Sequence, residues 1–144
     1  MIAVASDHAG YDLKKEIMKH LDEKGIQYKD YGTYEKQSCD YPDFAKLACD
    51  AVNEKKADKA LLFCGTGMGI SMAANKIKGI RAAACSDVFS AKYSRLHNDA
   101  NALCLGGRVV GAGLAAEIVD AFLSAEFEGG RHALRVEKIM SLEK

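Results

Sequence analysis

Short runs of apolar residues alternate along this chain with longer stretches that carry apolar residues at helical spacing. Such alternation is typical of βαβ units, in which each helix returns the chain to the start of the next parallel strand. Five strands are expected, over residues 2–6, 26–31, 59–64, 80–86 and 102–105. The third and fourth runs are almost continuously apolar, which indicates strands covered by helices on both faces.

Helices are expected between these strands. Leu13, Ile17 and Leu21 recur at helical spacing, and Gly25 follows them where a glycine commonly ends a helix. A second amphipathic stretch begins near Pro42, and proline is well tolerated in the first turn of a helix. The remaining helices are expected over residues 69–76, 87–96, 111–125 and 131–142.

The composition bounds the size and class of the protein. With 144 residues, of which 49% are hydrophobic, the chain can bury one core, so a single α/β/α domain over residues 1–144 is predicted. Lys plus Arg and Asp plus Glu number 20 each, which argues against a nucleic-acid partner or an anionic membrane surface. No apolar run approaches the ~20 residues of a membrane span, and no secretion signal is visible.

Five cysteines are scattered along the chain without CxxC or Cys/His ligand spacing. This pattern argues against disulfides and structural zinc. We therefore expect a cytoplasmic protein whose thiols are reduced, with no membrane partner and no metal site.

Polar residues gather at the carboxyl ends of the expected strands. In an open parallel sheet, ligands bind at that edge, at the point where the strand order reverses. The segments concerned are Ser6-Asp7-His8, residues 64–69, Cys85-Ser86-Asp87 and Gly106-Gly107-Arg108.

Residues 64–69, Cys-Gly-Thr-Gly-Met-Gly, form a glycine-rich turn from strand to helix, in which backbone N–H groups can converge on an anion. We call this segment the glycine loop. It is not a Walker A loop, because no Lys-Ser or Lys-Thr follows its last glycine, and it lacks the GxGxxG spacing of dinucleotide sites. Position 70, where a tyrosine phosphatase carries arginine, is isoleucine. The loop is best interpreted as an oxyanion-binding turn that opens with a cysteine.

Cys64 is therefore a candidate reactive thiol. A helix N-terminus favours the thiolate form, and the Thr66 hydroxyl is expected to hydrogen-bond to it. The alternative is that Cys64 is a small apolar core residue. The core interpretation is the one we favour for the other cysteines, Cys39, Cys49, Cys85 and Cys104.

Two further pairs carry polar chemistry. Asp7 and His8 end the first strand, although Asp7 would also serve as a plain helix N-cap. His97 and Asn98 follow the fourth helix, where the histidine would also serve to cap the helix C-terminus. The remaining histidines, His20 and His132, lack such placement and are expected at the surface.

Arg131 and Arg135 are four residues apart, so a helix would present both guanidinium groups on one face, as a phosphate site requires. The alternative is a solvated basic face paired with Glu128 or Glu137. Gly129–Gly130 favours the phosphate site, since two glycines permit a sharp turn that would lay the helix across a cleft.

Taken together, these segments resemble the type B ribose-5-phosphate isomerases, a family that also holds allose-6-phosphate and galactose-6-phosphate isomerases. The resemblance covers essentially the whole chain. Its blocks are Ser6-Asp7-His8-Ala9-Gly10, Asp40-Tyr41-Pro42, residues 64–70, residues 73–76, residues 79–82, residues 94–99, residues 107–111 and residues 127–132. It implies a Rossmann-like α/β/α sandwich, a homodimer whose active sites are shared across the interface, and in some members a tetramer.

The resemblance also implies an activity, the interconversion of ribose 5-phosphate and ribulose 5-phosphate in the pentose phosphate pathway without a cofactor or metal. Cys64 would be the base and His97 the ring-opening acid. No carboxylate occurs at 68–71, so the chain looks like the cysteine type rather than the glutamate type. Allose or galactose phosphates, with pocket depth set near Tyr41, Val88 and Phe89, and a non-catalytic sugar-phosphate sensor remain alternatives.

The other implied roles follow the same blocks. Asp7 and His8 would contact the sugar, Asn98 a hydroxyl or the enediolate, and three arginines the phosphate. The full set of implied substrate contacts is Asp7, His8, Tyr41, Gly65, Thr66, Gly67, Met68, Gly69, Asn98, Arg108, Arg131 and Arg135.

Overall fold

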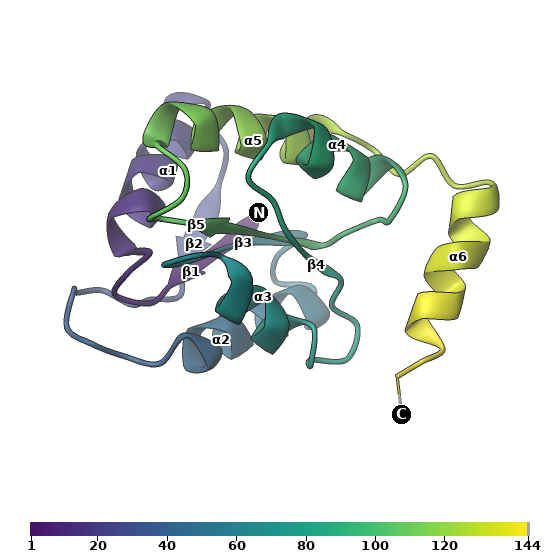
Figure 1. Ribbon diagram of the computed structural model, residues 1–144, viewed down its shortest axis with the longest axis horizontal. Coiled ribbons are helices and arrows are strands. Elements are labelled where there is room, and N and C mark those ends of the chain that lie inside the picture. Colours follow the sequence, from purple (N-terminus) through teal and green to yellow (C-terminus); the bar gives the residue numbers. More distant parts are fainter. Residues whose placement is uncertain (144) are drawn as a thin grey trace.

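Parallel strands form one sheet in the computed structural model, which describes residues 1–143 (Figure 1). The strands are β1 (Ile2–Ser6), β2 (Tyr28–Asp30), β3 (Lys59–Cys64), β4 (Ala82–Ala84) and β5 (Ala102–Gly106). The helices are α1 (Tyr11–Glu23), α2 (Tyr41–Asn53), α3 (Met68–Ala74), α4 (Val88–Leu96), α5 (Ala112–Ser124) and α6 (Arg131–Met140). The predicted α/β class is confirmed. The predicted domain ends at Lys144, which lies outside the described residues.

The strand order is β2-β1-β3-β5-β4. The chain runs outward from β1 to β2 and then returns to the other side of β1 with β3, so the order reverses between β1 and β3. In the register, Ser6 lies opposite Phe63 and Cys64 lies opposite Gly106. The carboxyl ends of the three central strands therefore meet at one edge of the sheet.

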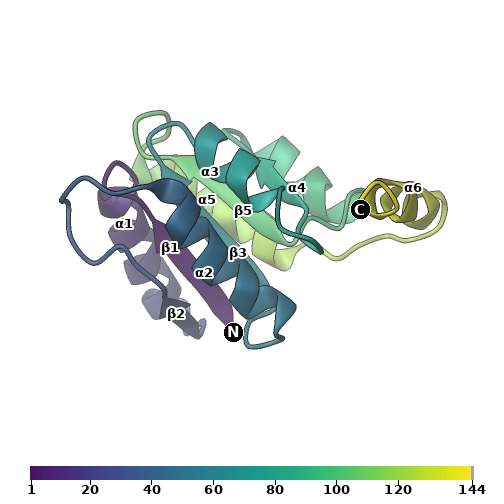
Figure 2. The same cartoon turned by 90° about the horizontal axis from the view of Figure 1, so that it is seen from below.

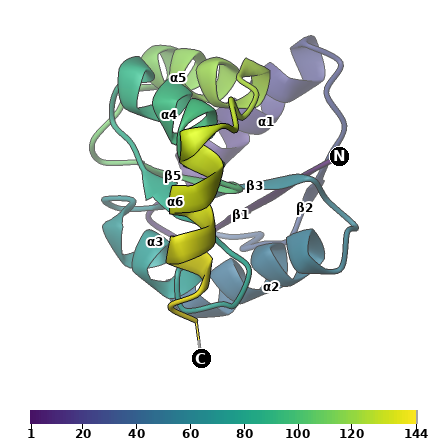
Figure 3. The same ribbon diagram turned by 90° about the vertical axis from the view of Figure 1, so that its right-hand side faces the viewer.

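Two helical layers cover the sheet. Figures 2 and 3 show α2 and α3 on one face, and α1, α4 and α5 on the other. Side chains alternate along each strand. In β1, for example, Val4 packs with the α1 and α5 layer, whereas Ala3 and Ala5 face the α2 and α3 layer. The second layer is rich in alanine, which allows its helices to lie close to the strands.

The prediction for the fourth strand was wrong in one respect. β4 is an edge strand that pairs only with β5, and its three alanines are half-buried rather than covered on both faces. The physical reason is the topology, because β5 inserts between β3 and β4. β2 and β4 are also shorter than their apolar runs suggested.

α6 extends from the body beyond the β4 edge (Figures 1 and 2). It has no buried residue. Its far end is attached through the Gly79 N–H, which donates to Glu143 Oε1 at 2.8 Å, and through Arg81, whose guanidinium lies 3.3 Å from Met140 Sδ. Among residues 1–143, no helix has the length and apolar character that crossing a membrane requires.

Candidate active site

The glycine loop lies where the order of the strands reverses, as the sequence predicted. The main chain ties three strand ends together there: the Asp7 N–H donates to Phe63 O, the Gly107 N–H to Cys64 O, and the Arg108 N–H to Gly65 O. These bonds are 2.8–3.1 Å long. The ends of β1, β3 and β5 thus form one rigid rim around the loop.

Cys64 ends β3 and is only 3% exposed. Its side chain packs with the apolar layer beneath α2 and α3, as the core interpretation requires. Its sulfur, however, accepts the N–H of Gly67 at 3.1 Å. A directed N–H is a contact that stabilises negative charge on sulfur, so the position also suits a reactive thiol.

Three other thiols are poor candidates for a base. Burial raises the pKa of Cys49 to about 12 and that of Cys85 to about 11, and it raises the pKa of Cys104 well above its ordinary value. These thiols stay protonated near neutral pH, as expected for core cysteines.

The loop is built by glycines that side chains would disrupt. Gly67 has φ +81°, a left-handed conformation, and is the N-cap of α3. A Cβ atom there would lie 3.0 Å from the backbone carbon of Leu105, and one on Gly106 would lie 2.6 Å from that of Thr66. The loop therefore rests directly on the end of β5.

Thr66 departs from its expected contact. Its Oγ1 accepts the N–H of Met68 at 3.1 Å, and the hydrogen-bond donor found at the Cys64 sulfur is the Gly67 N–H instead. Among the described residues, the expected hydrogen bond from the Thr66 hydroxyl to the sulfur is not formed.

Two predicted substrate contacts border the loop. A Cβ atom on Gly65 would lie 3.4 Å from an Arg108 guanidinium nitrogen, and one on Gly69 would lie 2.6 Å from Cζ of Tyr41. Arg108 thus lies at the start of the loop and Tyr41, the first residue of α2, at its end.

Asp7 is 5% exposed, and its Oδ1 accepts the Gly10 N–H at 2.9 Å. The carboxylate therefore holds the turn before α1, but it is not the N-cap of that helix, which is Gly10. His8 is half-buried, and its Nδ1 accepts the Cys39 N–H at 3.2 Å. Since Nδ1 is an acceptor, the neutral ring carries its proton on Nε2, which is a donor suited to an anion or hydroxyl.

Cys39 is the residue that the sequence misassigned at this edge. It is not a core residue but lies partly exposed in the β2–α2 connection, with its sulfur 3.9 Å from His8 Nδ1. The connection is anchored by Lys14, whose buried Nζ donates to Asp30 Oδ1 at 2.7 Å and to Thr33 O at 2.6 Å. Burial lowers the pKa of Lys14, and Asp30 opposes that shift.

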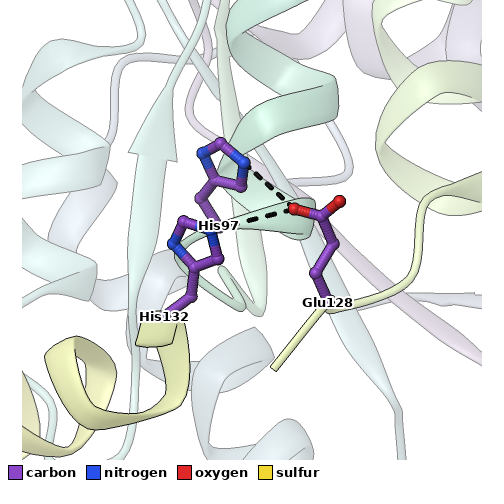
Figure 4. Close-up of side chains that lie close together, drawn as sticks. All are labelled: His97, Glu128 and His132. Atoms are coloured by element: carbon purple, nitrogen blue, oxygen red, sulfur yellow. Dashed lines mark ion pairs between the residues drawn. The ribbon is translucent and has the colours of Figure 1, made fainter. Parts of the chain in front are cut away.

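A second cluster lies at the C-terminal end of α4. His97 caps that helix, as the alternative interpretation held, and its Nε2 lies 3.1 Å from Glu128 Oε1. The His97 and His132 rings stack with centroids 4.0 Å apart and planes 10° from parallel (Figure 4). His132 was expected to be a plain surface residue, yet its side chain is only 13% exposed.

This cluster brings three metal-ligand types together, since the donor atoms of His97, Glu128 and His132 lie within 4.8 Å of one another. The two rings are nearly parallel, however, so their nitrogen lone pairs run side by side instead of converging on one point. The Glu128 carboxylate lies 3.1 Å from His97 Nε2 and 3.8 Å from His132 Nε2. An ion-paired cluster accounts for this arrangement better than a metal site.

Arg131 and Arg135 lie exposed on α6. Their predicted alternative partner, Glu128, pairs instead with the two histidines, and neither arginine forms an ion pair within residues 1–143. Both guanidinium groups are therefore available to a ligand.

The structure does not bring the two halves of the predicted site together. His97, Asn98 and the α6 arginines share no hydrogen bond or ion pair with the glycine loop among the described residues, and α6 lies beyond the β4 edge (Figure 1). A groove of about 720 Å³ separates α6 from that edge, with Arg81, Asn98, Ile139 and Leu142 in its wall. It contains Asn98 but not Cys64.

Comparison with known proteins gives one consistent result. Residues 2–139 match the family described as Ribose/Galactose Isomerase. Ribose-5-phosphate isomerase B of Escherichia coli is 51% identical over 143 residues, covering 99% of this chain and 96% of the relative. The probable ribose-5-phosphate isomerase B of Mycoplasma pneumoniae is 46% identical, covering 99% and 95%.

Solved structures agree. Ribose-5-phosphate isomerase B from Clostridium thermocellum superposes with a TM-score of 0.97 at 53% identity, covering 99% of this chain and 96% of that one. The enzyme from Mycoplasma genitalium, solved with bound ribulose-5-phosphate, superposes with a TM-score of 0.93 at 46% identity, covering 99% and 95%. With its parallel sheet and its glycine loop at the strand reversal, the chain belongs to the ribose/galactose isomerase family.

Proposed function

We propose that this protein interconverts D-ribose 5-phosphate and D-ribulose 5-phosphate through an enediolate, as a step of the pentose phosphate pathway. The observation that carries the proposal is the Cys64 sulfur, held by the Gly67 N–H at 3.1 Å in the glycine loop at the strand reversal. The names of the relatives, ribose-5-phosphate isomerase B, support the same substrate.

Cys64 is the base in this proposal. It takes the proton from C2 of the open-chain aldose and returns it to C1, with the sulfur as the shuttle. The N–H groups of residues 65–69 and the hydroxyl of Thr66 stabilise the oxyanion that develops, and such preorganised donors are worth about 3 to 4 kcal/mol each in other enzymes. Every step is assigned to groups of this chain, and none to a cofactor.

Other side chains bind and prepare the sugar. Asp7 and His8 contact its hydroxyls. The Cys39 N–H donates to Nδ1 of His8, so the Nε2–H of the same ring remains available to donate to the sugar. Tyr41 bounds the pocket beside Gly69, and Arg108 reaches the start of the loop.

The acid and the phosphate site complete the mechanism. His97 opens the furanose ring, Asn98 contacts a hydroxyl, and Arg131 with Arg135 holds the phosphate in bidentate contacts. These groups lie away from the glycine loop of their own chain, so we propose that they serve the loop of a second copy.

A homodimer with two shared sites follows from that separation, with a tetramer as a further association. α6 supports this assembly, because Leu134 and Ile139 are 57% and 45% exposed on a helix with no buried residue, and Leu142, just beyond it, is 77% exposed. Apolar side chains so exposed favour an interface. The five free cysteines are consistent with a cytoplasmic location.

Turnover of three sugars by the purified protein tests the activity. We expect ribose 5-phosphate to be isomerised faster than allose 6-phosphate or galactose 6-phosphate. Preference for a hexose phosphate would refute the proposed substrate, and binding of all three without turnover would make the protein a sensor.

Mixing two inactive variants tests the shared site. Cys64→Ala removes the base and His97→Asn removes the ring-opening acid. A dimer with one chain of each variant therefore keeps one complete site. After subunits exchange, activity should return to about a quarter of the parent's, since half the dimers are mixed and each has one working site. No recovery, despite verified exchange, would place both residues in the site of one chain.

A further inference from the structure

Three groups hold the imidazole of His97, and all belong to its own chain. Glu128 Oε1 lies 3.1 Å from Nε2, and the His132 ring stacks on one face at 4.0 Å (Figure 4). The Tyr93 ring meets the imidazole edge-on at 4.8 Å. A side chain fixed by packing on two sides and an ion-pair contact on a third has little freedom to rotate.

Glu128 is itself fixed by the main chain. Its N–H donates to Leu96 O at 3.0 Å, which attaches the α5–α6 connection to the residue before His97. The carboxylate therefore stays beside the ring even though its side chain is 52% exposed. Sequence alone gave no sign of this pairing, since Glu128 was weighed only as a partner of the arginines.

The position of the proton follows from this contact. The Glu128 carboxylate, 3.1 Å from Nε2, favours a proton on that nitrogen, so the remaining nitrogen, Nδ1, is left for the substrate. We propose that Glu128 is a positioning residue for the ring-opening step and that His97 acts on the sugar through Nδ1. This inference rests on the ring-opening role proposed above for His97.

The imidazolium gives its Nδ1 proton to the ring oxygen while the bond between that oxygen and C1 breaks. The anomeric hydroxyl releases its proton to water and becomes the aldehyde oxygen. Glu128 stabilises the charged imidazolium before the transfer, and His97 is reprotonated from solvent afterwards.

His132 is a weaker partner of the same carboxylate. Its Nε2 is 3.8 Å from Glu128 Oε1, beyond hydrogen-bond distance. Burial lowers the pKa of His132, and the neighbouring charges of His97 and Arg131 lower it further, while Glu128 opposes the shift. A neutral His132 ring packs against His97 without competing for the carboxylate, so Glu128 interacts chiefly with His97.

Glu128→Gln tests the inference, because glutamine keeps the shape but cannot accept as a carboxylate does. The matched control is Glu126→Gln, on the same connection, whose carboxylate forms no ion pair among the described residues. Turnover of ribose 5-phosphate, measured as kcat/KM, should fall about tenfold in Glu128→Gln, since the negative charge beside the imidazolium is removed. The control should keep the parent's value.

Ribulose 5-phosphate separates ring opening from proton transfer. With its C5 oxygen phosphorylated, this ketose has no furanose form, so exchange of its C1 hydrogen with D₂O needs Cys64 but not His97. Glu128→Gln should exchange that hydrogen at the parent's rate and with the parent's KM. A rise in KM would mean that Glu128 acts through the α6 arginines, and an equal loss of exchange and turnover would mean a general structural role; either result overturns the inference.

Nitrogen-15 NMR of the histidine rings gives a readout that does not depend on activity. In the parent, His97 should have a protonated Nε2 and a bare Nδ1 when neutral, and Glu128→Gln should show a mixture of tautomers. An unchanged tautomer or unchanged turnover in Glu128→Gln refutes the positioning role. If the parent itself fails to isomerise ribose 5-phosphate, the proposed function fails instead, whatever the tautomer.

Discussion

Gly67 connects the stability of the fold to the chemistry of the site, and its replacement by alanine tests both. The residue has φ +81°, and a Cβ atom would lie 3.0 Å from Leu105 C and 3.1 Å from Gly106 N, both in the backbone of a central strand. An L-residue in the left-handed region costs about 1 to 2 kcal/mol. Forcing an extra carbon against a rigid backbone costs about 1 to 3 kcal/mol more.

A loss of about 3 kcal/mol should lower the melting temperature by roughly 10 °C for a domain of this length. Calorimetry of Gly67→Ala measures it. The control is Gly113→Ala in α5, where nothing lies within 4 Å of the added carbon and φ is not positive. Alanine is the better helix former there, by about 0.5 kcal/mol, so this variant should melt slightly above the parent.

The same substitution should reduce activity in the folded protein. Relief of the clash moves the Gly67 N–H away from the Cys64 sulfur, which it now meets at 3.1 Å. At a temperature well below its transition, Gly67→Ala should therefore show a lower kcat for ribose 5-phosphate. Melting at the parent's temperature would refute the packing argument, and parental kcat in a destabilised variant would refute the role of this N–H.

Three other predictions concern the buried ion pair, a buried thiol and the phosphate site. Asp30→Asn leaves the buried Lys14 ammonium without its charged partner, 2.7 Å away, and should lower the free energy of unfolding in urea by about 3 kcal/mol. An unchanged midpoint would mean that the bond to Thr33 O alone stabilises the ammonium. Burial raises the folded-state pKa of Cys49 to about 12. The protonated thiol therefore contributes its full stability below pH 9, and this contribution is lost as pH rises toward 12. Between pH 8 and pH 10.5, the melting temperature of Cys49→Ala should fall less than that of the parent. Arg135→Ala should raise KM for ribose 5-phosphate about tenfold, with partial rescue by lysine, and a lowered melting temperature with unchanged KM would make it a structural residue.

The central strands were predictable because short, nearly continuous apolar runs favour strands that helices cover on both faces. β1 and β3 were predicted within their observed bounds. The position of β4 at the edge was not predictable, since a run of alanine is compatible with either place and the strand order depends on how distant segments pack.

At the site, the glycine loop was predictable because its spacing excludes the other glycine-rich motifs. The contacts of the residues beside the loop were not predictable. Cys39 reaches His8 only because Lys14 anchors the intervening connection, and Lys14 lies beside the apolar stripe of α1 with no local sign that it is buried. Contacts of this kind come from tertiary structure, which residue spacing does not encode.

His132 illustrates the same limit. Its spacing to Arg131 and Arg135 indicated only a helix face, and the stacking on His97 depends on how the α5–α6 connection returns to α4. Within one helix, spacing determines which side chains share a face. Spacing does not determine which side chains meet between helices, so the residues that surround His97 could be identified only from the structure.

The most direct test of the central claim, that Cys64 is the base, is exchange of the C1 hydrogen of ribulose 5-phosphate in D₂O, followed by proton NMR. This ketose needs no ring opening, so only the proton-transfer step is observed. The parent should exchange this hydrogen readily, and Cys64→Ala, checked for parental folding by calorimetry, should exchange it no faster than solvent alone. Exchange at the parent's rate in Cys64→Ala would contradict the account, because another group would then remove the proton.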